Sequence, residues 1–286
     1  MASISSPALS KAQISSFHQQ GFLHLKNWLP KDVLDPLSAH IDLVMKQAIE
    51  AEKSDYNSRL RADSTYTYSF AQPFLKILDN IHLHMGASFL PLLALPQITD
   101  VISSLCGAEY ICVKDVLVCK NKYERIEIPW HQDLITMSDK KYPAFALGIY
   151  LDDSTPGDGA VDYMPGTQSK KYDFNHMPPI YDEEIVTPEV QVGDIVIHDL
   201  LVLHKSDPLK YNDQRRTLYY EFRQLEQVTE VEKWPSNSIE CRLNLMRAAQ
   251  EMARVEGQEH QAETLEACYQ SPIPFNFSAD SYSGES

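Results

Sequence analysis

Two side chains that commonly bind metal ions stand close together in the segment Pro129-Trp130-His131-Gln132-Asp133. His131 and Asp133 are two residues apart, so on a β-strand both would point to the same face. An imidazole and a carboxylate on one face can supply two ligands to a metal ion. Because this spacing is common in proteins, the interpretation depends on a third ligand from elsewhere in the chain.

Two later histidines could supply that third ligand. His204 precedes Lys205-Ser206-Asp207-Pro208, where a strand would leave the core, and sites usually open at such ends. His198 lies deeper in the apolar run 194–203, which favours a packed histidine instead. His131, Asp133 and His204 would form a triad of two histidines and one carboxylate, the arrangement that suits non-haem Fe(II) and leaves positions open for other ligands.

An arginine pair follows His204 at the start of the next apolar strand. Arg215 is eleven residues after His204, and its guanidinium can bind a carboxylate through two parallel hydrogen bonds. Such an arginine would hold the far carboxylate of a 2-oxo acid bound at the metal. Arg216 is the alternative, since neighbouring strand residues face opposite ways and only one can point inward. We favour Arg215.

Composition limits the function classes. The chain has 286 residues with 25 basic and 40 acidic side chains, a formal net charge of −15. This balance argues against a general binder of nucleic acid or of anionic membranes. The N-terminal segment lacks a signal-peptide core, and no apolar stretch is long enough to span a bilayer, so we expect a cytoplasmic protein. The five cysteines form no CxxC pattern and are expected to be reduced.

The elements that would position these residues run from helices to strands and back to helix. Ser10-x-x-Gln13 resembles a capping box, and apolar residues recur at helical spacing over 33–45. Apolar runs separated by turns predict strands over 110–119, 145–151, 160–164, 194–197, 201–204 and 217–222. We expect a single α+β domain over 1–272, with a β core at about 108–225, helices at about 236–270 and a flexible tail over 273–286.

Several motifs together resemble the phytanoyl-CoA dioxygenase family of Fe(II)/2-oxoglutarate oxygenases. Segment 129–133 resembles the family's proximal metal motif. Asp158-Gly159-Ala160-Val161 and Met164-Pro165-Gly166-Thr167 resemble its turn and following segment, with Gln168 where the family often has histidine. Gly193-Asp194, with His204 eleven residues after Gly193, resembles the strand of the distal ligand. The resemblance covers about 14–222.

This resemblance implies a double-stranded β-helix, or jelly roll, with flanking N- and C-terminal helices. It implies Fe(II) bound by His131, Asp133 and His204, and 2-oxoglutarate and O2 as co-substrates. Arg215 would pair with the C5 carboxylate of 2-oxoglutarate, with help from Ser206 and Lys120. The expected reaction is hydroxylation, desaturation or cyclisation at an unactivated C–H bond, with release of succinate and CO2.

The substrate is expected to be a small metabolite, of the kind found in natural-product metabolism, and the protein to be a monomer or homodimer. Residues that flank the motif or the next strand are the substrate-pocket candidates: Trp130, Leu134, Met137, Tyr142 and Tyr150. Two alternatives remain. One is a catalytically inactive jelly roll that binds a metal or small molecule, and the other is a zinc hydrolase that uses the same triad.

Overall fold

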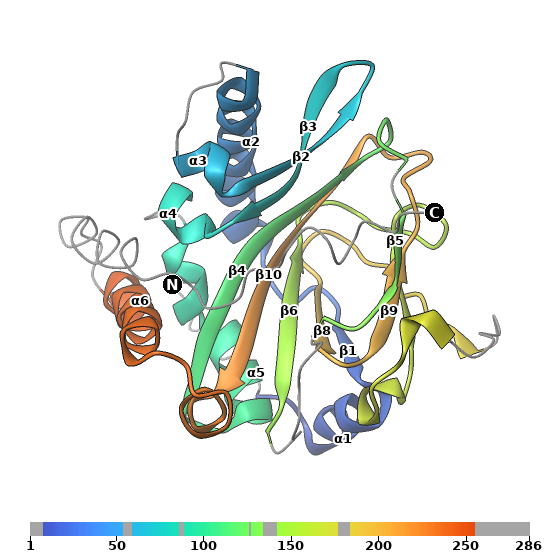
Figure 1. Cartoon of the computed structure of the whole chain (residues 1–286). Coiled ribbons are helices and arrows are strands. Elements are labelled where there is room, and N and C mark those ends of the chain that lie inside the picture. Colours follow the sequence, from blue (N-terminus) through green and yellow to red (C-terminus); the bar gives the residue numbers. More distant parts are fainter. Residues whose placement is uncertain are drawn as a thin grey trace.

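Two antiparallel sheets form the centre of the computed structural model, which describes residues 8–53, 59–85, 89–125, 127–133, 142–176 and 184–254 (Figure 1). The large sheet has the strand order β1-β8-β6-β10-β4-β3-β2, and the small sheet has the order β5-β9-β7. Their bounds are β1 Phe22–Leu25, β2 Ser64–Ser69, β3 Gln72–Asp79, β4 Tyr110–Asn121, β5 Ile128–His131, β6 Ala144–Tyr150, β7 Val161–Met164, β8 Ile195–Asp199, β9 Leu203–Ser206 and β10 Gln214–Gln224. This is the predicted α+β architecture with a jelly-roll core.

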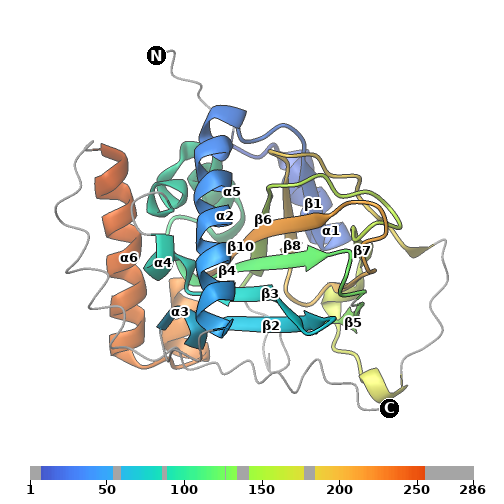
Figure 2. The ribbon, with the colours of Figure 1, turned by 90° about the horizontal axis from the view of Figure 1, so that it is seen from above.

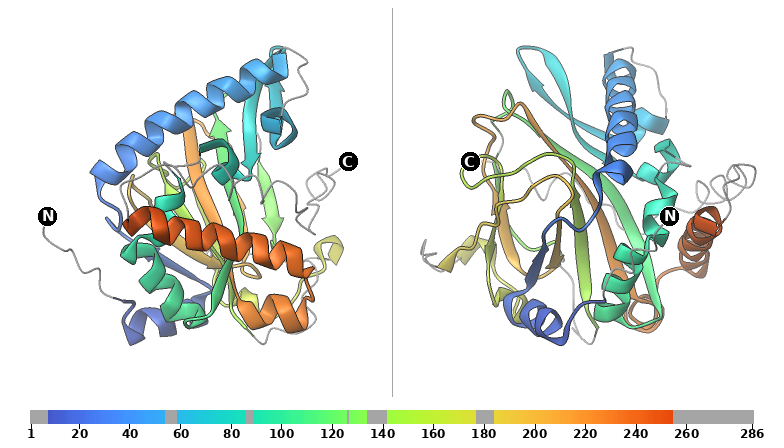
Figure 3. Two further views of the ribbon diagram at one scale, coloured as in Figure 1. Left: turned by 90° about the vertical axis from the view of Figure 1, so that its left-hand side faces the viewer. Right: turned by 180° about the vertical axis from the view of Figure 1, so that it is seen from behind.

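Helices cover one face of the large sheet, and the small sheet lies over the other (Figures 2 and 3). The helices are α1 Lys11–Gln20, α2 Lys31–Lys53, α3 Arg59–Ala62, α4 Ile81–Met85, α5 Pro96–Cys106 and α6 Ser236–Arg254. No helix in the described ranges is long and apolar enough to cross a membrane.

Strand β10 shows how alternation separates a core face from an interior face. Leu218, Tyr220 and Phe222 are buried in the apolar cluster that includes the helices, and the Tyr220 ring stacks on Phe89 at 5.1 Å between centroids. The residues between them point to the opposite face, between the two sheets. That interior carries the chemistry described below.

The predicted capping box is present at the start of α1. Ser10 accepts a hydrogen bond from the backbone of Gln13, and the Gln13 side chain accepts one from the backbone of Ser10. Gly21 ends the helix with φ of 82°, a left-handed conformation that glycine adopts without strain. The chain then enters β1, which pairs with β8 and places Phe22 opposite His198.

The large sheet extends beyond the range in which we expected strands. The predicted strands between 110 and 222 are present, but β1, β2 and β3 add three more from residues 22–79. Strand β1 has only four residues, and β2 reads Ser-Thr-Tyr-Thr-Tyr-Ser without a buried residue, so neither gives an apolar signal. At the other end, α6 begins at Ser236, the expected start of the helices over about 236–270, and the part of that range after residue 254 lies with the tail outside the described residues.

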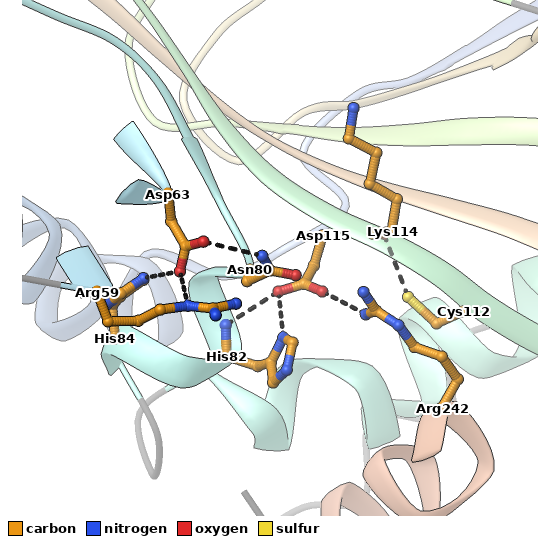
Figure 4. Close-up of polar contacts among 9 residues, drawn as sticks. All are labelled: Arg59, Asp63, Asn80, His82, His84, Cys112, Lys114, Asp115 and Arg242. Carbon is orange, nitrogen blue, oxygen red and sulfur yellow. Dashed lines mark hydrogen bonds and ion pairs between the residues drawn. The ribbon is translucent and has the colours of Figure 1, made fainter. Parts of the chain in front are cut away.

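A polar cluster fixes helices α4 and α6 to the helix-covered face of β4 (Figure 4). Asp115 accepts hydrogen bonds from the backbone and Nδ1 of His82, at 2.9 and 2.7 Å, and from Nη1 of Arg242, at 2.7 Å. Burial alone would raise the pKa of Asp115, but the contacts with His82 and Arg242 outweigh it and hold this pKa below its ordinary value.

We expect Asp115→Ala to lower the free energy of unfolding by about 3–5 kcal/mol, because it leaves the buried Arg242 guanidinium without its partner. Urea denaturation measures the change. Arg59→Ala is the control, since its ion pair with Asp63 is half-exposed and should contribute about 1 kcal/mol or less. Equal losses in the two variants would contradict a structural role for Asp115.

The cysteines are reduced in the described part of the chain. Cys106, Cys112 and Cys119 are buried, and Cys241 is partly buried on α6. Burial raises the pKa of Cys106 to about 12 and raises the pKa values of Cys112 and Cys119 as well. Cys112 and Cys119 belong to the apolar cluster on the helix-covered face of β4, which is the opposite face from Lys120.

Candidate metal centre

His131, Asp133 and His204 converge on one point of the interior. Their potential ligand atoms all lie within 4.8 Å of one another. Strands β5 and β9 are neighbours in the small sheet, and their register places His131 directly opposite His204. Asp133 lies two residues past the end of β5, so it enters the site from a loop and not from the strand face that its spacing suggested.

The two histidines are held with their Nε2 atoms turned to this point. Nδ1 of His131 lies 2.8 Å from the carbonyl oxygen of Pro129, and Nδ1 of His204 lies 3.0 Å from that of Val202. A carbonyl oxygen can only accept, so each Nδ1 carries a hydrogen, and in the neutral imidazole the lone pair is then on Nε2. That is the tautomer a metal ion requires of a histidine that binds through Nε2.

The charges in this cluster also suit a cation. Burial, with the nearby charge of His131, lowers the pKa of His204 to about 3, so its imidazole is neutral at neutral pH. Burial alone would raise the pKa of Asp133, but the surrounding histidines hold this pKa well below its ordinary value. The cluster thus offers a carboxylate and an imidazole in the states that bind metals.

Arg215 and Arg216 point to opposite faces of β10. Arg216 reaches the helix side, where its guanidinium lies 2.8 Å from Asp152 and 2.6 Å from Asp42. Arg215 faces the interior and is only 1% exposed. Its Nη1 donates a hydrogen bond to the carbonyl oxygen of Gly159, and its Nε has no hydrogen-bond partner among the residues that the structure describes.

Arg215 is therefore a buried charge without a counter-charge. No carboxylate of the described residues forms an ion pair with it, and burial of an unpaired guanidinium is costly. Burial raises the pKa of the Tyr163 phenol well above its ordinary value, and the Tyr163 ring lies 6.0 Å from that of His204. An anion between Arg215 and the triad would satisfy both the charge and the free donor.

Lys120 stands directly opposite Arg215 in the β4–β10 register. Its Nζ donates hydrogen bonds of 2.8 Å to the carbonyl oxygens of Ser206 and Asp207, so it ties β4 to the end of β9. Burial, followed by the charge of Arg215, lowers the pKa of Lys120 to about 7. Ser206 is buried beside it and offers its backbone oxygen to this contact.

The substrate candidates occupy different places. Leu134 and Met137 lie outside the described residues. Tyr150 is buried in the interior beside Tyr163 and Val161, whereas Tyr142 is partly buried just before β6. The ring centre of Trp130 lies 5.8 Å from the ammonium of Lys205. Lys205 follows the inward-facing His204 on β9, so its side chain points to the opposite face of the strand.

Sequence reasoning did not foresee the contact made by His198. This residue lies on β8 with its Nε2 3.1 Å from Oδ2 of Asp133. No spacing rule could have found the pair, because β8 and the loop after β5 belong to different layers and are 65 residues apart. A histidine within the mostly apolar run 194–203 was the available signal.

Comparisons with known proteins agree with this geometry. The sequence model described as "Phytanoyl-CoA dioxygenase (PhyH)" matches residues 17–217. A curated relative from Stutzerimonas stutzeri, a "Probable alpha-ketoglutarate-dependent hypophosphite dioxygenase", is 25% identical over 179 residues, which are 55% of this chain and 62% of that protein. The match thus spans less than two thirds of the relative's length.

Solved structures share the fold. AviO1 from Streptomyces viridochromogenes Tue57 is 21% identical with a TM-score of 0.61, over 77% of this chain and 97% of that one. EctD from S. alaskensis, solved with 2-oxoglutarate and 5-hydroxyectoine, is 17% identical with a TM-score of 0.61, over 77% of this chain and 78% of that one. The family match covers most of the chain and includes all three converging side chains, so the protein belongs to the phytanoyl-CoA dioxygenase family.

Proposed function

We propose that the protein is an Fe(II)/2-oxoglutarate-dependent oxygenase that hydroxylates, desaturates or cyclises a small molecule at an unactivated C–H bond. The observation that carries the proposal is the buried, uncompensated Arg215 in the same interior as the triad. A metal site alone would fit several reactions. A metal site beside an anion-binding guanidinium fits a co-substrate with a carboxylate at its far end.

The residues present fit the implied iron. Two imidazoles and one carboxylate are the donor set of the facial triad, and three ligands leave room for a bidentate 2-oxo acid and oxygen. Bound Fe(II) would supply the oxidising chemistry, which releases succinate and CO2 from 2-oxoglutarate.

The chain's own residues would bind and orient the reactants. Arg215 would hold the C5 carboxylate with its Nε donor, and Lys120 stands opposite it in the β4–β10 register. Tyr150 and Tyr163 line the interior between the sheets and exclude water from it. The carboxylate of Asp133 would bind the metal together with His131 and His204, and the reaction we propose is oxygen insertion, desaturation or cyclisation.

The first experiment adds Fe(II) and then 2-oxoglutarate to metal-free protein without oxygen. We expect a weak visible charge-transfer band from the chelate of iron and 2-oxo acid, which requires both the triad and the open positions. A folded, iron-loaded protein without this band would contradict the proposal. A zinc hydrolase or an inactive binding protein that needs no 2-oxo acid would then explain the site better.

We further propose that the substrate is a small metabolite, with natural-product metabolism as its setting. Structural neighbours include SnoK, described as a carbocyclase from nogalamycin biosynthesis, at 16% identity and a TM-score of 0.56. That likeness concerns the fold. Succinate release in the presence of candidate metabolites is the screen that identifies the substrate. The cytoplasmic location and the assembly as a monomer or homodimer remain predictions.

A further inference from the structure

A third histidine contacts the carboxylate that the triad contributes. Nε2 of His198 lies 3.1 Å from Oδ2 of Asp133, closer than Nε2 of His131 lies to Oδ1, at 3.5 Å, or Nε2 of His204 to Oδ2, at 3.7 Å. The His198 ring is also 4.8 Å from that of His204. Yet His198 is not one of the three side chains whose ligand atoms converge.

We propose that His198 is a positioning residue, which orients the carboxylate of Asp133 for metal binding through an Nε2–H···Oδ2 hydrogen bond. This inference rests on the proposed function, since it assigns a task within the same metal site. It gives His198 no direct bond to the metal.

The hydrogen atoms distinguish His198 from the two candidate ligands. His131 and His204 each donate Nδ1–H to a backbone carbonyl, so Nε2 is the ring nitrogen through which each would bind a metal ion. Nδ1 of His198 is buried and has no hydrogen-bond partner among the described residues. Its Nε2 faces a carboxylate oxygen, which can only accept, so Nε2 carries the hydrogen and donates it. Two histidines thus present lone pairs, and the third presents a donor.

The scaffold gives His198 a fixed position that Asp133 lacks. His198 lies within β8, between Phe22 on β1 and Ala146 on β6, and is 3% exposed. Asp133 follows β5 in a loop and is paired with no strand. The shortest polar contact of its carboxylate in the described chain is the one with His198. The large sheet therefore orients a ligand that the small sheet supplies.

This hydrogen bond has a consequence for how Asp133 binds. It occupies Oδ2 and limits rotation of the carboxylate, while Oδ1 stays turned toward His131. A carboxylate without it could rotate away or bind through both oxygens, which would fill a position that the co-substrate or oxygen needs. Mutation of a hydrogen-bond partner of this kind typically lowers the metal affinity by about 10- to 100-fold.

The test compares His198→Leu, His198→Asn and His198→Gln in anaerobic Fe(II) titrations of the full chain. Glutamine places an amide N–H near the Nε2 position, whereas asparagine is too short and leucine has no donor. We expect leucine and asparagine to weaken Fe(II) binding by about 10- to 100-fold and glutamine to stay within about threefold of wild type. The chelate band with 2-oxoglutarate should shift or weaken in the first two and be kept in the third.

His82→Gln is the matched control, because His82 is also buried and also contacts an aspartate, Asp115, but on the far side of the large sheet (Figure 4). It should lower stability and leave Fe(II) affinity unchanged. Equal Fe(II) affinity in all His198 variants would overturn the proposal, as would an equal loss in glutamine and leucine or a comparable loss in His82→Gln. Failure of wild type itself to bind Fe(II) would instead refute the proposed function.

Discussion

The Asp133→Ala variant is expected to lose Fe(II)-dependent turnover and to bind Fe(II) at least about 100-fold more weakly than wild type. Mutation of residues that only hydrogen-bond to a metal ligand typically lowers metal affinity by about 10- to 100-fold, and loss of the ligand itself should lower it by more. Asp133 is the one carboxylate of the converging set and carries its negative charge. Its removal leaves two neutral imidazoles, which bind Fe(II) poorly. Anaerobic titration with Fe(II) and succinate release measure the two effects.

Asp162→Ala is the matched control for this change. It removes the same charge from β7, where Asp162 contacts Lys205 and Thr187 instead of the triad. Its Fe(II) affinity should equal that of wild type. Wild-type turnover in Asp133→Ala would refute the assignment of the metal centre. A similar loss of Fe(II) affinity in Asp162→Ala would indicate that the overall negative charge, and not ligation by Asp133, determines Fe(II) binding.

Replacement of Arg215 by methionine should raise the apparent KM for 2-oxoglutarate by about two to three orders of magnitude, because a buried charge pair that loses one partner typically costs 2–5 kcal/mol. The same variant should lose its preference for 2-oxoglutarate over 2-oxobutyrate, which lacks the far carboxylate. That loss of discrimination is the sharper measurement, since general damage to the site would weaken both oxo acids alike.

Arg216→Met provides the comparison, since the two arginines are adjacent and point to opposite faces. It breaks the contacts with Asp152 and Asp42, so it should lower stability and keep the preference for 2-oxoglutarate. If Arg216→Met lost that preference and Arg215→Met kept it, the residue that binds the far carboxylate would be Arg216 and not Arg215.

Local patterns predicted the strand segments that carry these residues. Apolar runs indicated β4, β6, β8, β9 and β10, and the capping box indicated the start of α1. These features are readable because burial and capping depend on neighbours in sequence. Strand alternation likewise predicted that only one of Arg215 and Arg216 faces the interior, and that is how the two residues lie.

Long-range packing could not be predicted in the same way. Strand β2 is held in the sheet by its pairing with β3 and has no buried residue, so its sequence shows no apolar pattern. The contact between His198 and Asp133 depends on how the two sheets face each other, and the place of Asp133 in a loop depends on where β5 ends. Spacing along the chain carries no information on either.

The distribution of thiols across β4 bears on oxidative self-damage. A centre that activates oxygen exposes its surroundings to stray oxidants, and thiolates are the side chains most readily oxidised. Here Cys112 and Cys119 lie behind the large sheet, and burial keeps them as unreactive thiols. Among the described residues, the easily oxidised groups that face the interior include the phenols of Tyr150 and Tyr163. Inactivation during idle turnover should therefore modify tyrosine before cysteine.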